Sequence, residues 1–203
     1  LFDADYAYFS STSRSWMAHA ARYSAAMIDR FALTGDSHVM ELASNDGYLL
    51  RNFVAANIPC LGVEPTHAAA NAARALGIDV VEAFFGEDLA GTLPRADLIA
   101  GNNVFAQVPD INDVSRGMAR SLQEQGVITL EFPSLLTLVE KHQFDTVYHE
   151  HFSYLSLLSV ERILRAAGLR VFDIDQLDTH GGSLRVFACH LNADHAETEN
   201  VAA

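Results

Sequence analysis

Short apolar segments alternate with amphipathic helical patterns along most of the chain, and this alternation limits the fold more than any other feature. The predicted strands cover residues 38–44, 60–65, 78–84, 96–103 and 126–133. The predicted helices between and before them cover residues 14–32, 48–57, 66–76 and 111–124. Strands that alternate with helices in this way form βαβ units, which build a parallel sheet with helices on both faces.

The last part of the chain follows a different pattern. A helix predicted at 153–167 ends at Gly168, and two β-rich segments, "LRVFDIDQL" and "GSLRVFACHL", then flank the turn "DTHGG". Two such segments joined by a glycine-containing turn indicate a hairpin. We therefore expect one α/β domain over residues 37–192, with a mostly parallel sheet and an antiparallel strand near its edge. Residues 1–36 are predicted as an N-terminal helical extension and residues 193–203 as a linker or tail.

Composition and charge argue against several classes of protein. With 50% hydrophobic and 19% charged residues, the sequence suits an ordered globular domain, and no apolar segment approaches the ~18 residues of a membrane span. The formal net charge of −13 argues against a nucleic-acid partner. Cys60 and Cys189 are expected to be buried thiols in a reducing cytoplasm, and the start of the chain does not resemble a signal peptide. Because it also lacks an initiator Met, the sequence is expected to be a piece of a longer chain.

The turn after the first predicted strand, "ELASNDGYL", indicates the type of cofactor. In a doubly wound sheet, ligands bind beyond the carboxyl ends of the strands, and a nicotinamide site would need G-x-G-x-x-G there. This turn has one glycine, and it also lacks the spaced glycines and the Lys of a P-loop. An acid at the strand end, a tight glycine-containing turn and a second acid one strand later suit S-adenosylmethionine.

Individual residues can be assigned to that cofactor. Glu64, which closes the second strand, is placed to accept both ribose hydroxyls because carboxylate oxygens are acceptors only. Glu41 is expected either to stabilise the methionine ammonium group or to brace the turn, whose backbone N–H groups can face the methionine end. Phe84 and Phe85 are expected either to lie against adenine or to belong to the core. The predicted cofactor-binding residues are Glu41, Ala43, Ser44, Asn45, Gly47, Glu64, Phe85, Asn102, Asn103 and Phe105.

The segment "YHEH" places four polar side chains directly before a helix: Tyr148, His149, Glu150 and His151. An imidazole is a suitable base for removing a proton from carbon at neutral pH, and a phenol is a suitable donor to the developing oxyanion. An extended segment would place Tyr148 and His151 on opposite faces, so their convergence requires a local turn. Two alternatives stay open: a metal site, for which H-x-H supplies two ligands without a recognisable third, and a polar loop that caps the helix at Ser153.

Several segments together resemble one family. "DYAYFSS", "ELASNDGYL", "GVEP", "GNNVFAQVPDIND", "FDTVYHEHFSYLSLLSVERIL" and "THGGSLRVF" are similar to the S-adenosylmethionine-dependent C-methyltransferases that branch deoxysugars bound to a nucleoside diphosphate. The similarity runs over nearly the whole chain and implies a class I methyltransferase-like Rossmann fold. In that family a small zinc-binding domain precedes this portion and a second α/β domain follows it, so the chain resembles the central methyltransferase module.

The resemblance implies proton abstraction next to a ketone, followed by attack of the enolate carbon on the sulfonium methyl group. His151 matches the general base of the family, and Tyr148 and Glu150 match its polar neighbours at the sugar. The residues expected on the substrate side are Tyr6 or Tyr8, Gln107 and His180. The family often has His at the position of Gln107, and glutamine cannot relay a proton, although it can form a hydrogen bond. For His180, the two following glycines alone would also explain a hairpin turn.

The implied partners are a nucleotide-sugar substrate and the flanking domains of a longer chain, without a metal ion, nucleic acid or membrane. Other functions stay open. A methyltransferase of the same fold could act on an oxygen or nitrogen of another small metabolite. The chain could also be a cofactor-binding module that is inactive without its flanking domains, since its scattered arginines form no obvious diphosphate clamp. A nicotinamide oxidoreductase is the least favoured alternative.

Overall fold

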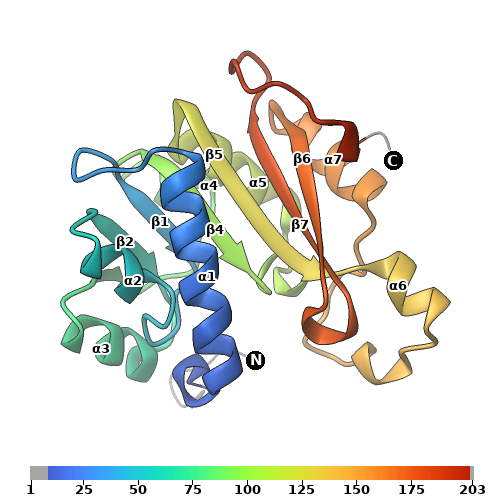
Figure 1. The fold of residues 1–203 in the computed structure, drawn as a ribbon, viewed down its shortest axis with the longest axis horizontal. Helices are drawn as coiled ribbons and strands as arrows, with labels where there is room; N and C mark the ends of the chain where they lie inside the picture. The colour runs from blue at the N-terminus through green and yellow to red at the C-terminus, as the bar shows by residue number, and fades with distance from the viewer. Residues whose placement is uncertain (1–8, 202–203) are drawn as a thin grey trace. The chain divides into compact units, whose positions relative to one another are not determined.

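The computed structural model describes residues 9–201, so Tyr6 and Tyr8 lie outside the described part of the chain. The chain divides after Phe85 into two compact units. Unit 1 contains the N-terminal helix and the first three strands, and unit 2 contains the four later strands with their helices (Figure 1). Within residues 9–201, none of the helices is both long enough and apolar enough to span a bilayer.

Unit 1 begins with a long helix whose first turn is capped. The Ser13 side chain accepts a hydrogen bond from the Trp16 backbone N–H, and Ala20, Tyr23 and Met27 form the buried side of this helix. The elements of unit 1, with η for a short 3-10 helix, are η1 (Ser10–Thr12), α1 (Arg14–Arg30), β1 (Val39–Leu42), α2 (Leu50–Ala55), β2 (Cys60–Val63), α3 (His67–Ala75) and β3 (Asp79–Val81).

The strands of unit 1 are parallel and lie in the order β3-β2-β1. Every residue of β1 is buried, as expected for a strand covered on both faces. The alanine-rich helix α3 buries Ala69, Ala70 and Ala73. Their small side chains let the helix approach the turn that follows β1, since a Cβ atom added to Gly47 would lie 3.2 Å from the Cβ of Ala73.

Unit 2 is built around a longer sheet in the order β4-β5-β7-β6. β4 and β5 are parallel, whereas β7 is antiparallel to both β5 and β6, so the predicted antiparallel strand near the edge is confirmed. The elements of unit 2 are α4 (Glu87–Ala90), β4 (Ala96–Asn102), η2 (Phe105–Gln107), α5 (Ile111–Ser121), β5 (Leu122–Pro133), α6 (Leu135–Glu140), η3 (Phe144–Thr146), α7 (Leu157–Ala166), β6 (Leu169–Leu177), η4 (Thr179–Gly181), β7 (Ser183–His190) and η5 (Glu199–Val201).

Two boundaries in unit 2 differ from the prediction, for physical reasons. α7 begins at Leu157 instead of residue 153, because Ser156 is its N-cap and exchanges hydrogen bonds with Ser159 in a capping box. β5 begins at Leu122 instead of residue 126, where it pairs with Ala96 ahead of an irregularity in the register. The segment before α7 is therefore free to form the non-helical turn described below.

The residues after β7 lie along β6. The side chains of Thr198 and Asn200 donate hydrogen bonds to the carboxylate of Asp173, and Arg170 donates to the carbonyl of Ala193 at 2.8 Å. This segment, predicted as a linker or tail, thus has defined contacts within unit 2.

Candidate active site

The turn after β1 has an unusual backbone. Ala43, Asn45 and Gly47 have φ angles of 53°, 50° and 77°, in the left-handed region that glycine adopts most easily. At Gly47 a side chain is also sterically excluded, because a Cβ atom would lie 2.4 Å from Cδ1 of Ile78. The single glycine of "ELASNDGYL" therefore stands where the backbone and its surroundings require it.

The predicted backbone donors of this turn are used within unit 1. The N–H of Ser44 donates to the carbonyl of Val63 at 3.2 Å, and the N–H of Gly47 donates to the carbonyl of Ser44 at 3.1 Å. The N–H of Asn45 donates to Oε2 of Glu64 at 2.9 Å. These three bonds hold the turn, and they use three of the five backbone N–H groups of residues 43–47.

Glu64, just after β2, is a buried acceptor that the protein already uses. Its Oε1 accepts from the backbone N–H of Thr66 at 2.9 Å and from the Thr66 hydroxyl at 2.5 Å. With the bond from Asn45, three hydrogen bonds reach a carboxylate that offers about four acceptor positions. Glu64 therefore retains capacity for about one further donor, rather than for the two ribose hydroxyls that the sequence suggested.

Unit 1 also contains buried side-chain oxygens without a hydrogen-bond partner among residues 9–201. They are Glu41 Oε2, Ser44 Oγ and Asp46 Oδ1, and all three belong to β1 or to the turn that follows it. Buried polar atoms normally have partners, so this concentration fits a site for a polar ligand. The sequence signal was the acid within the apolar strand "HVMELAS".

Glu41 has the most strongly shifted acid–base equilibrium of this group. Desolvation by burial raises the pKa of its carboxyl well above 4.5, the Tyr48 hydroxyl counteracts this by a hydrogen bond, and the charges of Glu64 and Asp46 raise it further. Burial thus disfavours the ionised form of this carboxyl, and an approaching cation or hydrogen-bond donor would favour it. The methionine ammonium group of the predicted cofactor has that character.

The raised pKa of Glu41 predicts a pH-dependent stability. The ordinary pKa of a glutamate carboxyl is 4.5. Between this pH and the higher pKa of Glu41 in the folded state, the folded chain binds more protons than the unfolded chain, so the free energy of unfolding falls as the pH rises. In the Glu41→Gln variant the side chain cannot ionise, so its stability should not fall with rising pH in this way. The variant should therefore be more stable than wild type at pH 8 but not at pH 4. Each tenfold change in proton affinity corresponds to about 1.4 kcal/mol.

Urea unfolding of the ligand-free protein at several pH values measures this difference. Glu124→Gln is a control, because Glu124 is exposed near the start of β5 and its carboxylate is solvated in both states. Equal pH dependence of Glu41→Gln and wild type would contradict the prediction.

The segment before α1 forms hydrogen bonds with side chains of the same turn. The backbone N–H of Ser10 donates to Oδ1 of Asn45 at 2.8 Å, and that of Ser11 donates to Oδ2 of Asp46 at 3.2 Å. The sequence reasoning missed this contact, because no periodicity relates η1 to a turn 35 residues away. The N-terminal extension is therefore part of the candidate site, since it fixes two side chains of the cofactor turn.

The aromatic residues after β3 differ in exposure. Phe84 is 68% exposed, and Phe85 is partly buried at the end of unit 1. The alternative that Phe84 belongs to the core is therefore wrong. The predicted adenine contact of Phe85 stays a prediction.

In unit 2, the end of β4 carries a second group of unpaired polar atoms. Oδ1 and Nδ2 of Asn102 and Oδ1 of Asn103 have no hydrogen-bond partner within the described chain. Asn103 has a φ of 54°, and its N–H donates to the carbonyl of Glu131 at 2.8 Å. Phe105 is almost fully buried, whereas Gln107, at the end of η2, is partly exposed. Of these residues, the two asparagines are best suited to meet a polar ligand.

The "YHEH" segment forms the turn that its chemistry requires. The N–H of His151 donates to the carbonyl of Tyr148 at 3.1 Å, and the two rings lie 4.3 Å apart between centroids with a 37° interplanar angle. The Tyr154 ring lies 6.0 Å from the imidazole between centroids, in a T-shaped arrangement with an interplanar angle of 82°. The N–H groups of Phe152 and Ser153 both donate to the carbonyl of Ala106, which ties the turn to η2. The local turn that their convergence requires is present, and it lies at residues 148–151, ahead of the start of α7 at Leu157.

The hydrogen bond of the imidazole defines its tautomer. Nδ1 of His151 lies 3.1 Å from the carbonyl oxygen of Thr146, and a carbonyl only accepts, so Nδ1 carries the hydrogen. Nε2 is then the basic nitrogen. The neighbouring phenol is a donor: desolvation raises the pKa of Tyr148, with smaller contributions from the charge of Glu150 and from Tyr154, so it keeps its proton.

The hairpin turn "THGG" has a fixed conformation. His180 has φ 51° and ψ 36°, and its side chain is exposed. The carbonyl of Gly181 accepts hydrogen bonds from Gln143 Nε2 at 2.9 Å and from Lys141 Nζ at 3.1 Å. The turn therefore lies beside the segment after α6 (Figure 1), which also leads to His151.

A buried ion pair beneath this turn was not found from the sequence. Arg185 of β7 lies opposite Glu131 of β5, with Nη2 2.6 Å from Oε2 and side chains that are 7% and 0% exposed. The Thr179 hydroxyl donates to Oε1 of Glu131 at 2.9 Å. The acid inside the apolar segment "GVITLEFP" was the available signal.

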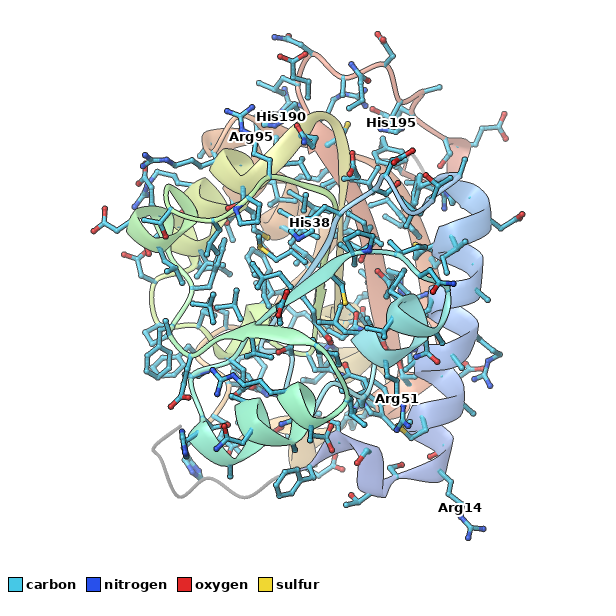
Figure 2. The ribbon with its side chains drawn as sticks, turned by 90° about the vertical axis from the view of Figure 1, so that its left-hand side faces the viewer. Arg14, His38, Arg51, Arg95, His190 and His195 are labelled. Carbon is cyan, nitrogen blue, oxygen red and sulfur yellow. The ribbon has the colours of Figure 1, made fainter. Side chains whose placement is uncertain are left out.

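Two further features bear on the chemistry. Within residues 9–201, no group of three or more His, Cys, Asp or Glu side chains is arranged to hold a metal ion. Figure 2 shows two basic side chains of unit 1, Arg14 extending outward from the start of α1 and Arg51 on α2.

The geometry of the two units and the comparisons with known proteins define a class of protein. The fold is the α/β fold of class I S-adenosylmethionine-dependent methyltransferases, with a mixed sheet and an N-terminal helix. It matches magnesium protoporphyrin IX methyltransferase from Synechocystis, solved with bound SAH, with a TM-score of 0.66 over 86% of this chain and 83% of that one, at 14% identity. An S-adenosylmethionine-dependent methyltransferase from Clostridium acetobutylicum matches with a TM-score of 0.66 over 86% and 92%, at 11% identity.

The sequence places the chain within this class. Residues 16–174 match the family model described as a methyltransferase domain, and the chain belongs to that family. A similar curated protein is the C-methyltransferase NovU from Streptomyces niveus, 37% identical over 194 residues, which are 94% of this chain and 46% of NovU. The chain thus spans about half the length of this curated relative.

Proposed function

We propose that the chain is the methyltransferase module of an enzyme that adds a methyl group to a carbon next to the ketone of a nucleotide-bound deoxysugar. The observation that carries the proposal is the imidazole of His151, whose Nδ1–H is held by a carbonyl and whose ring lies against a protonated phenol. The identity to a C-methyltransferase and the resemblance of the "YHEH" and "THGG" segments to deoxysugar enzymes supply the substrate class.

The residues of unit 1 fit the cofactor that this class uses. Glu64 would accept one ribose hydroxyl with its remaining acceptor position. Glu41, neutral when no cation is near, would ionise beside the methionine ammonium group, because an opposite charge favours the carboxylate. When bound, S-adenosylmethionine supplies an electrophilic methyl group.

The residues of unit 2 would handle the proton. Nε2 of His151 takes the hydrogen from the carbon beside the ketone, and the electrons of the broken C–H bond form an enolate with its negative charge on the ketone oxygen. The Tyr148 hydroxyl donates a hydrogen bond to that oxygen, which stabilises the charge. Glu150 and Gln107 would bind sugar hydroxyls, and His180 would contact the nucleotide-sugar from the hairpin turn.

The position of the transferred methyl group tests the proposal. S-adenosylmethionine with a ¹³C-labelled methyl group is incubated with a nucleoside diphosphate 4-keto-deoxysugar and the protein, and the product is analysed by ¹³C NMR. A methyl carbon bonded to carbon is expected. Methylation at oxygen or nitrogen would contradict the proposal, as would the absence of any transfer by a longer chain that contains both flanking parts.

Cofactor binding provides a separate prediction. Isothermal titration with S-adenosylhomocysteine should show binding to this chain, and Glu64→Gln should weaken it by roughly tenfold, the typical value of one hydrogen bond to a charged group. Glu82→Gln is a matched control in unit 1, because Glu82 is at the surface, where it pairs with His67 and Arg74. Equal affinities of Glu64→Gln and Glu82→Gln would exclude Glu64 from the site.

A further inference from the structure

In unit 2, hydrogen bonds linked by short stretches of backbone lead from the buried ion pair to the imidazole. It begins at Glu131, which binds Arg185 through Oε2 and accepts from the Thr179 hydroxyl through Oε1. Because both charged groups are buried and paired across neighbouring strands, they form a rigid support for the hairpin turn. The first residue of the "THGG" turn is thereby fixed to the sheet.

The next step joins the turn to the segment after α6. Nε2 of Gln143 donates to the carbonyl of Gly181 at 2.9 Å. The contact is tight, because a Cβ atom added to Gly181 would lie 2.5 Å from this nitrogen. The Gln143 side chain therefore has a defined position against the turn.

The last step reaches the imidazole. The backbone carbonyl of Gln143 accepts from the Thr146 hydroxyl at 2.5 Å, and the carbonyl of Thr146 is the partner of Nδ1 of His151 at 3.1 Å. One residue, Gln143, thus contacts the hairpin turn with its side chain and the segment that orients the imidazole with its backbone.

Packing does not hold this segment in place. Neither α6 nor η3 has a buried residue, and Phe144 and Val147 are 75% and 57% exposed. With little buried surface, the conformation of such a segment depends strongly on its hydrogen bonds. Its bonds to the hairpin turn come from the side chains of Gln143 and Lys141, and Gln143 is the one of the two whose carbonyl also binds Thr146.

We infer that Gln143 is a positioning residue, which keeps the imidazole of His151 in the Nδ1–H tautomer by anchoring the Thr146 carbonyl to the hairpin turn. Its consequence for catalysis rests on the proposed function, because only the Nδ1–H tautomer presents Nε2 as a base. The inference about the tautomer itself concerns the protein alone.

The test combines a spectroscopic and a kinetic measurement on Gln143→Met, which keeps the side-chain length and removes the amide. ¹⁵N NMR of the histidine rings, at a pH where they are neutral, should show His151 as the Nδ1–H tautomer in wild type. In Gln143→Met a fraction of the Nε2–H tautomer should appear, and kcat should fall roughly fivefold, the effect of one lost hydrogen bond. The affinity for S-adenosylhomocysteine should not change. His151→Gln identifies the resonances.

Gln125→Met is the matched control, because Oε1 of Gln125 accepts from the backbone N–H of Asp194 at 2.9 Å and thus also joins two segments of unit 2. It should keep the wild-type tautomer and kcat. Gln143→Glu, which lacks the amide donors, should reproduce the effect of Gln143→Met. A single Nδ1–H tautomer in both Gln143 variants would overturn the inference. If a longer chain that contains both flanking parts transfers no methyl group, the proposed function fails, but the NMR measurement still decides the role of Gln143.

Discussion

Replacing His151 with glutamine should lower kcat by about 10²–10⁴-fold, the usual effect of removing a general base. Glutamine has a similar reach and can still donate a hydrogen bond to the Thr146 carbonyl, but it has no nitrogen that can take up a proton. The affinity for S-adenosylhomocysteine should stay nearly unchanged, because the residues assigned to the cofactor's ribose and methionine end belong to unit 1. Steady-state kinetics and isothermal titration measure the two effects separately.

The neighbouring imidazole provides a control for this experiment. His149 is exposed and stands two residues from His151, so His149→Gln changes the local charge and composition in the same way. It should retain activity within a small factor. A normal rate for His151→Gln, or an equal loss in both variants, would show that the base is another group.

Removing one partner of the Glu131–Arg185 pair should produce the largest loss of stability. Glu131→Met removes the carboxylate that lies 2.6 Å from the buried guanidinium of Arg185, leaving the carboxylate of Asp175 at 4.0 Å, and it also removes the acceptor of the Thr179 hydroxyl. Breaking a buried pair in this way typically costs about 3–5 kcal/mol of unfolding free energy. Urea unfolding of the ligand-free protein measures the loss.

A double-mutant cycle separates the pair from the packing of its side chains. Because an apolar pair can replace a buried ion pair at little cost, Glu131→Met combined with Arg185→Met should recover much of the lost stability. Glu87→Met is the comparison, since Glu87 and Arg116 are also 2.6 Å apart but about half exposed, and its effect should be much smaller. Strictly additive losses in the Glu131 and Arg185 variants would show that the two charges do not interact.

The order of elements could be predicted because the periodicity of apolar residues reports burial directly. β1, buried along its whole length, and the antiparallel β7 both follow from such patterns. The start of α7 could not be predicted, because a capping box at Ser156 and Ser159 decides it, and another serine, Ser153, offers an alternative cap three residues earlier.

The candidate site could be predicted in its residue types but not in its connections. The sequence indicated Glu41, Glu64 and His151 as candidate functional residues, and it showed that Tyr148 and His151 could converge only through a local turn. The partners of these groups come from distant positions: Arg185 meets Glu131 across 54 residues, which depends on the register of two strands. The use of Glu64 by Thr66 was also missed, because a carboxylate at a strand end does not show how many of its acceptor positions are already occupied.

The carbonyl that holds Nδ1 of His151 has a consequence for turnover. A carbonyl oxygen has no proton to release and cannot carry one away, so the ring cannot relay a proton between Nε2 and Nδ1. In the proposed reaction, the proton taken up at Nε2 would therefore leave from the same nitrogen before the next turnover, and since His151 is partly exposed, solvent water would be its acceptor.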